Sequence, residues 1–436
     1  MTGPAEISAA VADAHRRGWA LVLAATARVA RDLDLAEECV QEAYAAALKA
    51  WSRTGIPREP VAWLTTTAKR RALDVLRREQ VFRTKLPLLM DPGEAATDEL
   101  STVEDEAVAG SEPVEPADVV PDERLRLIFL CCHPALAQEA QMALTLRLVC
   151  GVPTSELARA FLVSEATMAA RLTRAKKKIS VARIPYRIPS ARALPDRLGG
   201  VLGVIHLLFT MGHTAPAGDS LVRADLMDQA LHLARMLSEL MPDEPEVRGL
   251  LALLLLSHAR RATRVDDRGR LLRLSEQDRS QWDRSMIAEA RDLIMAGLRG
   301  GRAGRYLLQA AIAYVYVDAP TYDQTDWAQI LALYDRLLQV WPSPVVAVNR
   351  TVALAEVQGP ESALAEIEAL EQDHRLTGYQ YLPAIKAELL ARLGRRDEAS
   401  VAYRRALELA TNEVERAFLA ERLAEATTRS RVGDGA

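Results

Sequence analysis

The segment from residue 86 to residue 121 divides the chain and limits how the whole can fold. It contains no Lys or Arg, whereas residues 86–123 carry twelve carboxylates and are interrupted by five prolines. Because like charges repel one another and proline cannot continue a helix, such a segment is extended and builds no core. We therefore expect an acidic linker over residues 86–121, with separate folded blocks before and after it.

The composition of the whole chain is that of a helical protein. Hydrophobic residues make up 49% of the 436 residues and aromatic residues only 5%. Ala, Leu and Arg dominate, which favours helices over strands. The formal net charge of −4 excludes a uniformly basic nucleic-acid coat protein, so any nucleic-acid surface has to be local. We expect an all-α protein with cores of ordinary size.

Cysteine usage and the N-terminus indicate the compartment. Four cysteines in a chain of this length do not make a disulfide scaffold, which predicts a reducing environment. The N-terminus lacks a basic start followed by an apolar run. The longest apolar run, residues 310–317, is much shorter than the roughly 20 residues that span a bilayer. We therefore expect a cytoplasmic protein.

The first block, residues 1–85, contains two helical segments with contrasting charge, separated by a break at residues 55–57 and Pro60. The segment DLAEECVQEAY predicts a helix that buries Cys39, Val40 and Ala43 and leaves an acidic face outside. That face consists of Asp34, Glu37, Glu38, Gln41 and Glu42. It suits a basic partner helix, although a solvated helix surface is the alternative interpretation.

The segment after the break combines an aromatic ring, hydroxyls and cations on one short helix. Its side chains are Trp63, Thr65, Thr66, Thr67, Lys69, Arg70 and Arg71. Stacking rings and cations together are what holding melted single-stranded DNA requires. The alternative is again a solvated basic helix.

Residues 122–183 contain a helix-turn-helix pattern. Thr154 or Ser155 can cap a first helix, and Ser164 can cap a second helix that turns Met168 and Leu172 inward. The second helix then exposes a polar start and a basic end suited to a major groove and its flanking phosphates. The exposed residues are Glu165, Thr167, Arg171, Arg174, Lys176, Lys177 and Lys178. Leu162 stands in the turn, where glycine is common.

The remainder of the chain is helical and contains a repeat. Small and apolar residues recur at relative positions 0, 4 and 7, most regularly after residue 330. They are Ala230, Ala234 and Leu237, then Ile330, Tyr334 and Leu337, then Ala363, Ile367 and Leu370, then Ala399, Tyr403 and Ala406. This pattern is typical of the second helix of a tetratricopeptide (TPR) repeat, or of any helical hairpin with small packing residues. The polar stretch 263–283 interrupts the repeat.

Metal and catalytic chemistry have little support in the sequence. Cys131-Cys132-His133 could supply zinc ligands, but adjacent cysteines poorly fit one tetrahedral ion and no second Cys pair exists. Buried cysteines near the end of a helix are the better interpretation. His206, His213, His232 and His258 lack HExxH spacing, and no nucleotide-binding glycine loop is visible. We expect no metal, no cofactor and no enzymatic activity.

Two motifs together carry a resemblance to a known family. DLAEECVQEAY with PREPVAWLTTTAKRRALDVLRRE resembles the sigma-two domain of extracytoplasmic-function (ECF) sigma factors, and SELARAFLVSEATMAARLTRAKKKI resembles their sigma-four domain. LRLIFLCCHPAL, DRLGGVLGVIHLLF, QTDWAQILALYDRLL and PSPVVAVNRTVALAEVQGP resemble the subgroup with a long C-terminal extension containing TPR repeats. One departure is Thr210-Met211-Gly212-His213, where relatives often carry Asn-Glu-Gly-Tyr.

The resemblance implies distinct domains along the chain, each with its own contact on polymerase or DNA. The domains would be sigma-two at residues 1–85, sigma-four at 122–183, a family-specific helical domain at 184–300 and TPR-like repeats at 301–436. The acidic face would bind the β′ clamp helices of core RNA polymerase, and sigma-four would bind the β flap. The acidic linker would pass near the polymerase RNA channel.

The same resemblance implies where promoter DNA would bind. Residues 54–58, with Thr54 and Arg58, would hold a flipped base of the minus-ten element beside Trp63, Thr66, Lys69, Arg70 and Arg71. The helix starting at Ser164 would read the minus-thirty-five element. The extension would gate promoter use and offer a groove to a protein partner.

We therefore interpret the chain as an alternative sigma factor that initiates transcription. A conventional helix-turn-helix regulator with a TPR sensor domain is the alternative, and it leaves the acidic face and the Trp63–Arg71 segment without a role. A scaffold protein would explain only the repeat.

Overall fold

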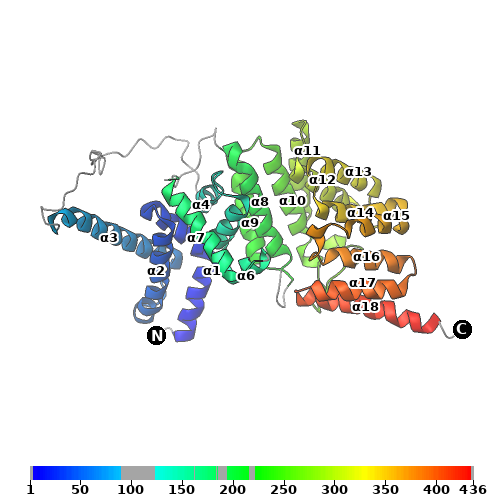
Figure 1. Cartoon of the computed structure of the whole chain (residues 1–436), viewed down its shortest axis with the longest axis horizontal. Coiled ribbons are helices and arrows are strands. Elements are labelled where there is room, and N and C mark those ends of the chain that lie inside the picture. Colours follow the sequence, from blue (N-terminus) through cyan, green and yellow to red (C-terminus); the bar gives the residue numbers. More distant parts are fainter. Residues whose placement is uncertain are drawn as a thin grey trace. The chain divides into compact units, whose positions relative to one another are not determined.

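The structure is a computed structural model that describes residues 3–89, 123–161, 163–182, 184, 194–215 and 221–433. Within these ranges the chain is helical, and the one β-type pairing is an isolated bridge between Val265 and Leu271. The expected all-α class is confirmed (Figure 1). Residues 90–122, which hold most of the predicted acidic linker, and Leu162 in the predicted turn lie outside the described residues.

The chain divides into two compact units, residues 1–204 and 205–436. The first unit begins with three long helices, α1 (Pro4–Ala30), α2 (Leu33–Thr54) and α3 (Pro60–Leu89). α1 packs against both α2 and α3. The side chain of Asp32 caps α2 by accepting a hydrogen bond from the Leu35 amide at 2.9 Å. Gly55 ends α2 with φ of +80°, a conformation that favours glycine.

The third helix is longer than the sequence pattern suggested. The expected short helix around Trp63 is part of α3, which has 30 residues. The helix continues because good helix formers such as Ala72 and Leu73 follow Arg71, and no proline lies between Pro60 and Pro87. The prediction of a short segment was therefore wrong in length, and Pro60, predicted as part of the break, is the first residue of the helix.

Four further helices complete most of the first unit. They are α4 (Glu123–Cys131), α5 (Gln138–Cys150), α6 (Thr154–Ala160) and α7 (Glu165–Val181). α4 and α5 also pack against α1, so these helices share a core with the first three. Leu125, Phe129 and Leu144 are fully buried in this part of the unit. Met168 and Leu172 of α7 are buried as predicted.

The unit boundary falls within α8 (Leu194–His213). In the first unit, Arg197 of this helix donates a hydrogen bond to the carbonyl of Phe129 at 3.0 Å. Among the described residues, α8 is the one helix with the length and mean hydropathy of a membrane span, and half of that apolar window is buried in the fold. Burial of this kind is what a core helix of a water-soluble fold also shows.

The second unit consists of helices α9 to α18 with short 3₁₀ turns between some of them. Their bounds are α9 (Ala224–Leu240), α10 (Pro245–Ala259), α11 (Arg284–Arg299), α12 (Arg305–Asp318), α13 (Trp327–Val340), α14 (Pro344–Gln358), α15 (Pro360–Leu370), α16 (Tyr381–Arg392), α17 (Arg396–Leu409) and α18 (Glu413–Gly433). From α12 onward each helix packs against the next. The result is a row of helix pairs, α12 with α13, α14 with α15 and α16 with α17 (Figure 1).

The repeated small residues lie on the packing face of these helices. Ala363 and Ile367 are fully buried on α15, and Ala399 and Ala406 are fully buried on α17. Gly359 and Gly394 adopt positive φ at the turns that precede α15 and α17. The polar stretch 263–283 lies between α10 and α11, begins at the end of a 3₁₀ turn (Arg261–Thr263) and contains a second one (Arg279–Gln281).

Candidate polymerase and promoter interface

The predicted polymerase-binding face lies on α2, and the structure divides it into an exposed and a buried part. Asp34, Glu38, Gln41 and Glu42 are exposed. Glu37 is only 7% exposed. The expectation that all five side chains lie outside was therefore wrong for Glu37, because other elements of the first unit cover it.

Two cations cover Glu37. The ammonium of Lys176, on α7, forms ion pairs with Glu37 and with Asp34, the latter at 2.8 Å. The guanidinium of Arg147, on α5, lies 4.0 Å from Glu37. Burial alone would lower the pKa of the Lys176 ammonium, but its hydrogen bonds to Asp34 and Glu37 raise that pKa above its usual value. The amine is therefore charged at neutral pH and held between two carboxylates.

This contact joins two sites that the sequence predicted separately. Lys176 belongs to the predicted minus-thirty-five set, and Asp34 and Glu37 belong to the predicted polymerase set. A carboxylate that is paired with Lys176 cannot at the same time form that ion pair with a basic side chain of another protein. Likewise, this ammonium cannot reach a DNA phosphate while it is held on α2.

The aromatic part of the predicted minus-ten surface is anchored at the start of α3. Trp63 is half-buried and meets the buried ring of Trp51 edge to face, with ring centroids 5.7 Å apart. Thr65, Thr66 and Thr67 each donate a hydrogen bond to the carbonyl four residues earlier, at 2.8–2.9 Å. The hydroxyls are thus engaged with the helix backbone, and Thr54 does the same with Ala50 at 3.0 Å.

The cations of this region fall into a free and a paired group. Within the described residues, Arg58, Lys69 and Arg70 form no ion pair, and Arg58 and Arg70 are exposed. Arg71 instead pairs with Glu42 of α2, a member of the predicted polymerase set. Both side chains of that pair are more than 40% exposed, so the pair contributes little to stability.

The predicted DNA-reading helix α7 has the expected cap and face. Ser164 accepts a hydrogen bond from the amide of Thr167 at 3.2 Å, which confirms it as the N-cap. Glu165, Thr167, Arg174 and Lys177 are exposed. Arg171 is half-buried, and its guanidinium lies 5.8 Å from the ring centroid of Phe161. Of the residues predicted to contact the minus-thirty-five DNA, Lys176 is the one that forms ion pairs within the part of the chain that the structure describes.

The Cys131-Cys132-His133 segment is a buried turn. Both cysteines are buried at the end of α4, and burial raises the pKa of the Cys132 thiol to about 12. His133 Nδ1 accepts a hydrogen bond from the amide of Ala135 at 3.1 Å. No group of three or more His, Cys, Asp or Glu side chains arranged for a metal ion occurs within the described ranges. Protonated thiols and an occupied imidazole nitrogen are poor zinc ligands.

Three parts of the chain match models of known protein families. Residues 16–81 match the family model described as Sigma-70 region 2, and residues 126–179 match the one described as Sigma-70, region 4. Residues 197–297 match a family of unknown function (DUF6596). The chain belongs to the ECF sigma factors with a C-terminal extension. As a sigma factor it acts in transcription initiation, with core RNA polymerase and promoter DNA as partners.

A full-length relative shares the extension. An uncharacterized protein of Rhizobium meliloti (strain 1021) is 44% identical over 397 residues, which is 91% of each chain. The resemblance seen in the motifs is thus confirmed for the sigma factor and for its C-terminal extension.

Sequence reasoning missed Arg147 as part of the interface. Arg147 is a charged residue inside the apolar run LTLRLV of α5, and an isolated charge in a buried helix signals a nearby opposite charge. The identity of that partner, Glu37, depends on packing between segments more than 100 residues apart in sequence.

Proposed function

We propose that this ECF sigma factor binds core RNA polymerase through the exposed side of α2 and recognises a two-part promoter in the cytoplasm. Glu38, Gln41 and Glu42 would meet the β′ clamp helices, and the sigma-four helices α4 to α7 would meet the β flap. The exposure of Glu38 and Gln41, which have no partner within the described residues, supports this role best. The polymerase supplies all covalent chemistry.

The free cations around α3 support a place for the minus-ten DNA. Arg58, Lys69 and Arg70 carry charge that no described carboxylate neutralises, and DNA phosphates would supply the missing negative charge. The half-buried ring of Trp63 is held at a fixed angle by Trp51 and offers a surface against which an unpaired base can stack. The hydroxyls of Thr54 and Thr66 are not free to contact DNA, since they donate hydrogen bonds to the helix backbone. These two residues would therefore shape the surface beside the DNA.

The exposed side of α7 supports a place for the minus-thirty-five DNA. Ser164, Glu165 and Thr167 form its polar first turn, and the first turn of a recognition helix is where base edges are contacted. Arg171, Arg174 and Lys177 follow along the helix, where phosphates flank the groove.

Engagement with polymerase would exchange the partners of Lys176. Its ion pairs with Asp34 and Glu37 occupy one end of the acidic face. A basic residue of polymerase would take over the carboxylates, and Lys176 would become free for DNA. The free protein is therefore held in an arrangement that polymerase binding opens.

Run-off transcription with purified core polymerase tests the main proposal. The double variant Glu38→Ala, Gln41→Ala should lose most promoter-dependent initiation, because both side chains lie on the free part of the face. Lys49→Ala, an exposed residue on the same helix, is the matched control and should retain activity. Full initiation by the double variant would contradict the assignment of this face.

Promoter opening tests the assignment of α3. Lys69→Ala with Arg70→Ala should reduce permanganate reactivity of minus-ten thymines roughly tenfold or more, since two phosphate contacts are lost. Recruitment of polymerase to the promoter should fall less. A conventional regulator would instead bind duplex DNA without polymerase and leave the thymines unreactive.

Lys176→Met tests the exchange step. Removing the ammonium should raise the affinity for core polymerase several-fold, because the carboxylates no longer have to give up a partner. Lys177→Met, its exposed neighbour, should leave that affinity unchanged. Equal behaviour of the two variants would contradict the exchange.

We further propose that the helix pairs of the second unit form a TPR-like array that modulates promoter use through a protein partner. The pattern is buried at positions 0 and 4 on α15 and at positions 0, 4 and 7 on α17, which supports a repeat of this type. A chain that ends at residue 215 keeps α8 and should change promoter output relative to the full chain. Unchanged output across a promoter set would refute the modulatory role.

A further inference from the structure

The second unit contains a cavity of about 350 Å³ between α10, α12, α13 and α14. This is within the roughly 300–1,000 Å³ typical of small-molecule sites. Its walls are mainly apolar, with Leu253, Ile312, Ile330 and Val346 among the lining side chains. Leu274 of the polar stretch 263–283 also contributes to the wall.

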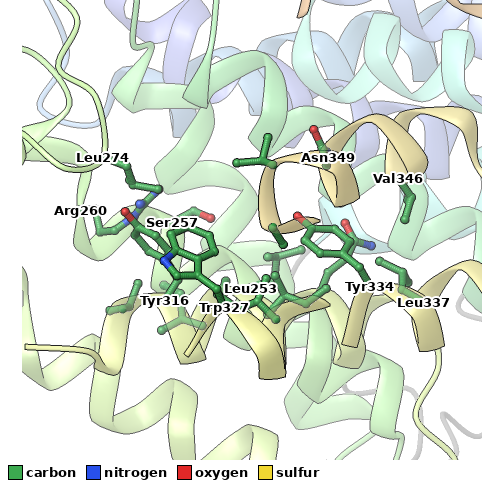
Figure 2. A pocket seen from close by; sticks show the side chains of 18 residues that line it. Leu253, Ser257, Arg260, Leu274, Tyr316, Trp327, Tyr334, Leu337, Val346 and Asn349 are labelled. Atoms are coloured by element: carbon green, nitrogen blue, oxygen red, sulfur yellow. The ribbon is translucent and has the colours of Figure 1, made fainter. Parts of the chain in front are cut away.

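The polar groups of the cavity gather at two ends. Figure 2 shows Arg260, Ser257, Tyr316 and Trp327 at one end and Tyr334 with Asn349 toward the other. An apolar chamber with a few placed polar groups is the usual form of a site for an amphipathic ligand. The arrangement therefore distinguishes a polar end from an apolar middle.

Arg260 gives the polar end its charge. Its guanidinium lies 5.8 Å from the ring centroids of both Trp282 and Tyr316, and no carboxylate pairs with it within the described part of the chain. Burial lowers the pKa of this guanidinium, Tyr316 partly opposes that effect, and the neighbouring Arg279 lowers the pKa further. The two aromatic faces offset part of the cost of withdrawing this charge from water, but they supply no counter-charge.

A neighbouring arginine, unlike Arg260, is tied to the backbone. Arg279 donates hydrogen bonds from Nη1 to the carbonyls of Tyr316 and Ala319 at 2.9 and 2.5 Å, while its buried Nη2 has no partner among the described residues. These bonds fix Arg279 to the backbone as a structural residue. Arg260, by contrast, lines the cavity and has no hydrogen bond from its side chain to any other described residue.

Tyr316 provides a second unused polar group at the same end. The side chain is only 6% exposed, and its hydroxyl has no hydrogen-bond partner among the described residues. A buried donor without a partner costs free energy that a ligand oxygen would recover. One unpaired cation and one unpaired hydroxyl thus lie on the wall of one chamber.

We propose that this cavity binds a small organic anion with an apolar body, such as a medium-chain or aromatic carboxylate. Arg260 receives the carboxylate, the Tyr316 hydroxyl donates a hydrogen bond to it, and the apolar body lies among Leu253, Ile330 and Val346. The inference concerns binding alone, so its test does not depend on the transcriptional roles proposed above. The second unit is thereby a receptor for a small molecule.

A matched pair of probes on the purified full chain tests the charge requirement. Decanoate and decanamide have the same hydrocarbon body, and only decanoate is anionic. Isothermal titration should show one decanoate per chain, bound at least roughly tenfold more tightly than decanamide, because a charge-assisted pair is lost with the amide. Equal affinity of the two probes, or binding of neither, would overturn the proposal.

Variants locate the binding site. Arg260→Gln should weaken decanoate binding roughly tenfold or more and leave decanamide binding within twofold. Ala313→Phe, which places a ring in the cavity, should abolish binding of both probes. Arg336→Gln, an exposed arginine of the second unit, is the control and should bind as the parent does. Decanoate binding that survives Ala313→Phe would place the ligand elsewhere and overturn the assignment.

Two further measurements keep the test decisive. If Arg260→Gln fails to fold by circular dichroism, Tyr316→Phe provides the second variant and should weaken decanoate binding several-fold without affecting decanamide. Inorganic phosphate should bind at least tenfold more weakly than decanoate. Phosphate binding that is as tight as that of decanoate, and that Arg260→Gln removes, would overturn the requirement for an apolar body.

Discussion

Lys176 in the first unit and Arg260 in the second are both half-buried cations, and the protein treats them in opposite ways. Lys176 is held by the carboxylates of Asp34 and Glu37, with Arg147 beside them. Arg260 has two aromatic faces and no carboxylate within the described residues. A paired charge stabilises the free protein and must be released to act, whereas an unpaired one favours an added anion.

The largest effect should come from removing the carboxylate that Lys176 and Arg147 share. Glu37→Ala leaves two partly buried cations with less counter-charge, which should lower the free energy of unfolding of the first unit by about 3–4 kcal/mol. Hydrogen-exchange mass spectrometry should show the loss in α2 and α7. Asp34→Ala is the control, because Asp34 is 67% exposed, and it should cost less than about 1 kcal/mol. Equal losses for both variants would contradict the conclusion that the buried carboxylate of Glu37, rather than the exposed one of Asp34, stabilises the two cations.

A half-buried histidine, His206, shows a third way to handle such a charge, which is to keep the group neutral. Burial, with the nearby Arg305, lowers the pKa of His206 to about 4. The unfolded chain takes up this proton near pH 6.5 and the folded chain only near pH 4, so this stability is complete above pH 6.5 and is lost as pH falls toward 4. The loss should reach about 2–3 kcal/mol in the second unit. His206→Gln should remove this part of the acid sensitivity in urea unfolding measured from pH 7 to pH 4.

Replacing the unpaired cation Arg260 should change the free energy of unfolding in the opposite direction to replacing Glu37. Arg260→Met removes a desolvated charge that has no counter-charge, at the expense of two cation–π contacts. The free energy of unfolding of the ligand-free second unit should rise by about 1 kcal/mol. Thermal unfolding of the two proteins at low ionic strength measures this difference. A loss of stability would mean that Arg260 is a structural residue like Arg279.

The smallest effect should come from the exposed ion pair. Glu42→Gln breaks its pair with Arg71, in which both side chains are substantially exposed. The free energy of unfolding should change by less than about 1 kcal/mol, and the change should vanish in high salt. Urea unfolding at low and high sodium chloride concentration checks this. A loss as large as that of Glu37→Ala would show that exposure does not separate the two pairs.

Local patterns were sufficient to predict several features of the site. The cap at Ser164 and the inward turn of Met168 are confirmed, because each depends on residues within one helical turn. The burial of Cys131 and Cys132 is confirmed for the same reason. The predicted acidic face of α2 wrongly included Glu37 as an exposed residue. The residues near Glu37 in sequence do not reveal the two cations that cover it.

The cavity was beyond sequence reasoning, although one signal was present. The stretch 263–283 interrupted the repeat with arginines and Trp282, and it was interpreted as a weakness of the repeat. In the structure Arg279 of this stretch lies over the rings of both Trp282 and Tyr316, and Tyr316 of α12 lines the cavity. An interruption that keeps aromatic and charged residues is a reason to look for a site.

The sequence by itself determined the helical class, the family and the order of the parts, because helix periodicity, capping and motif spacing act over a few neighbouring residues. Only the tertiary structure decided which charges are satisfied. The pairing of Lys176 with Glu37 joins residues 139 positions apart, and the cavity beside Arg260 is lined by residues of four helices. Electrostatic energy depends on distance in space and on burial, and neither quantity is encoded in local sequence.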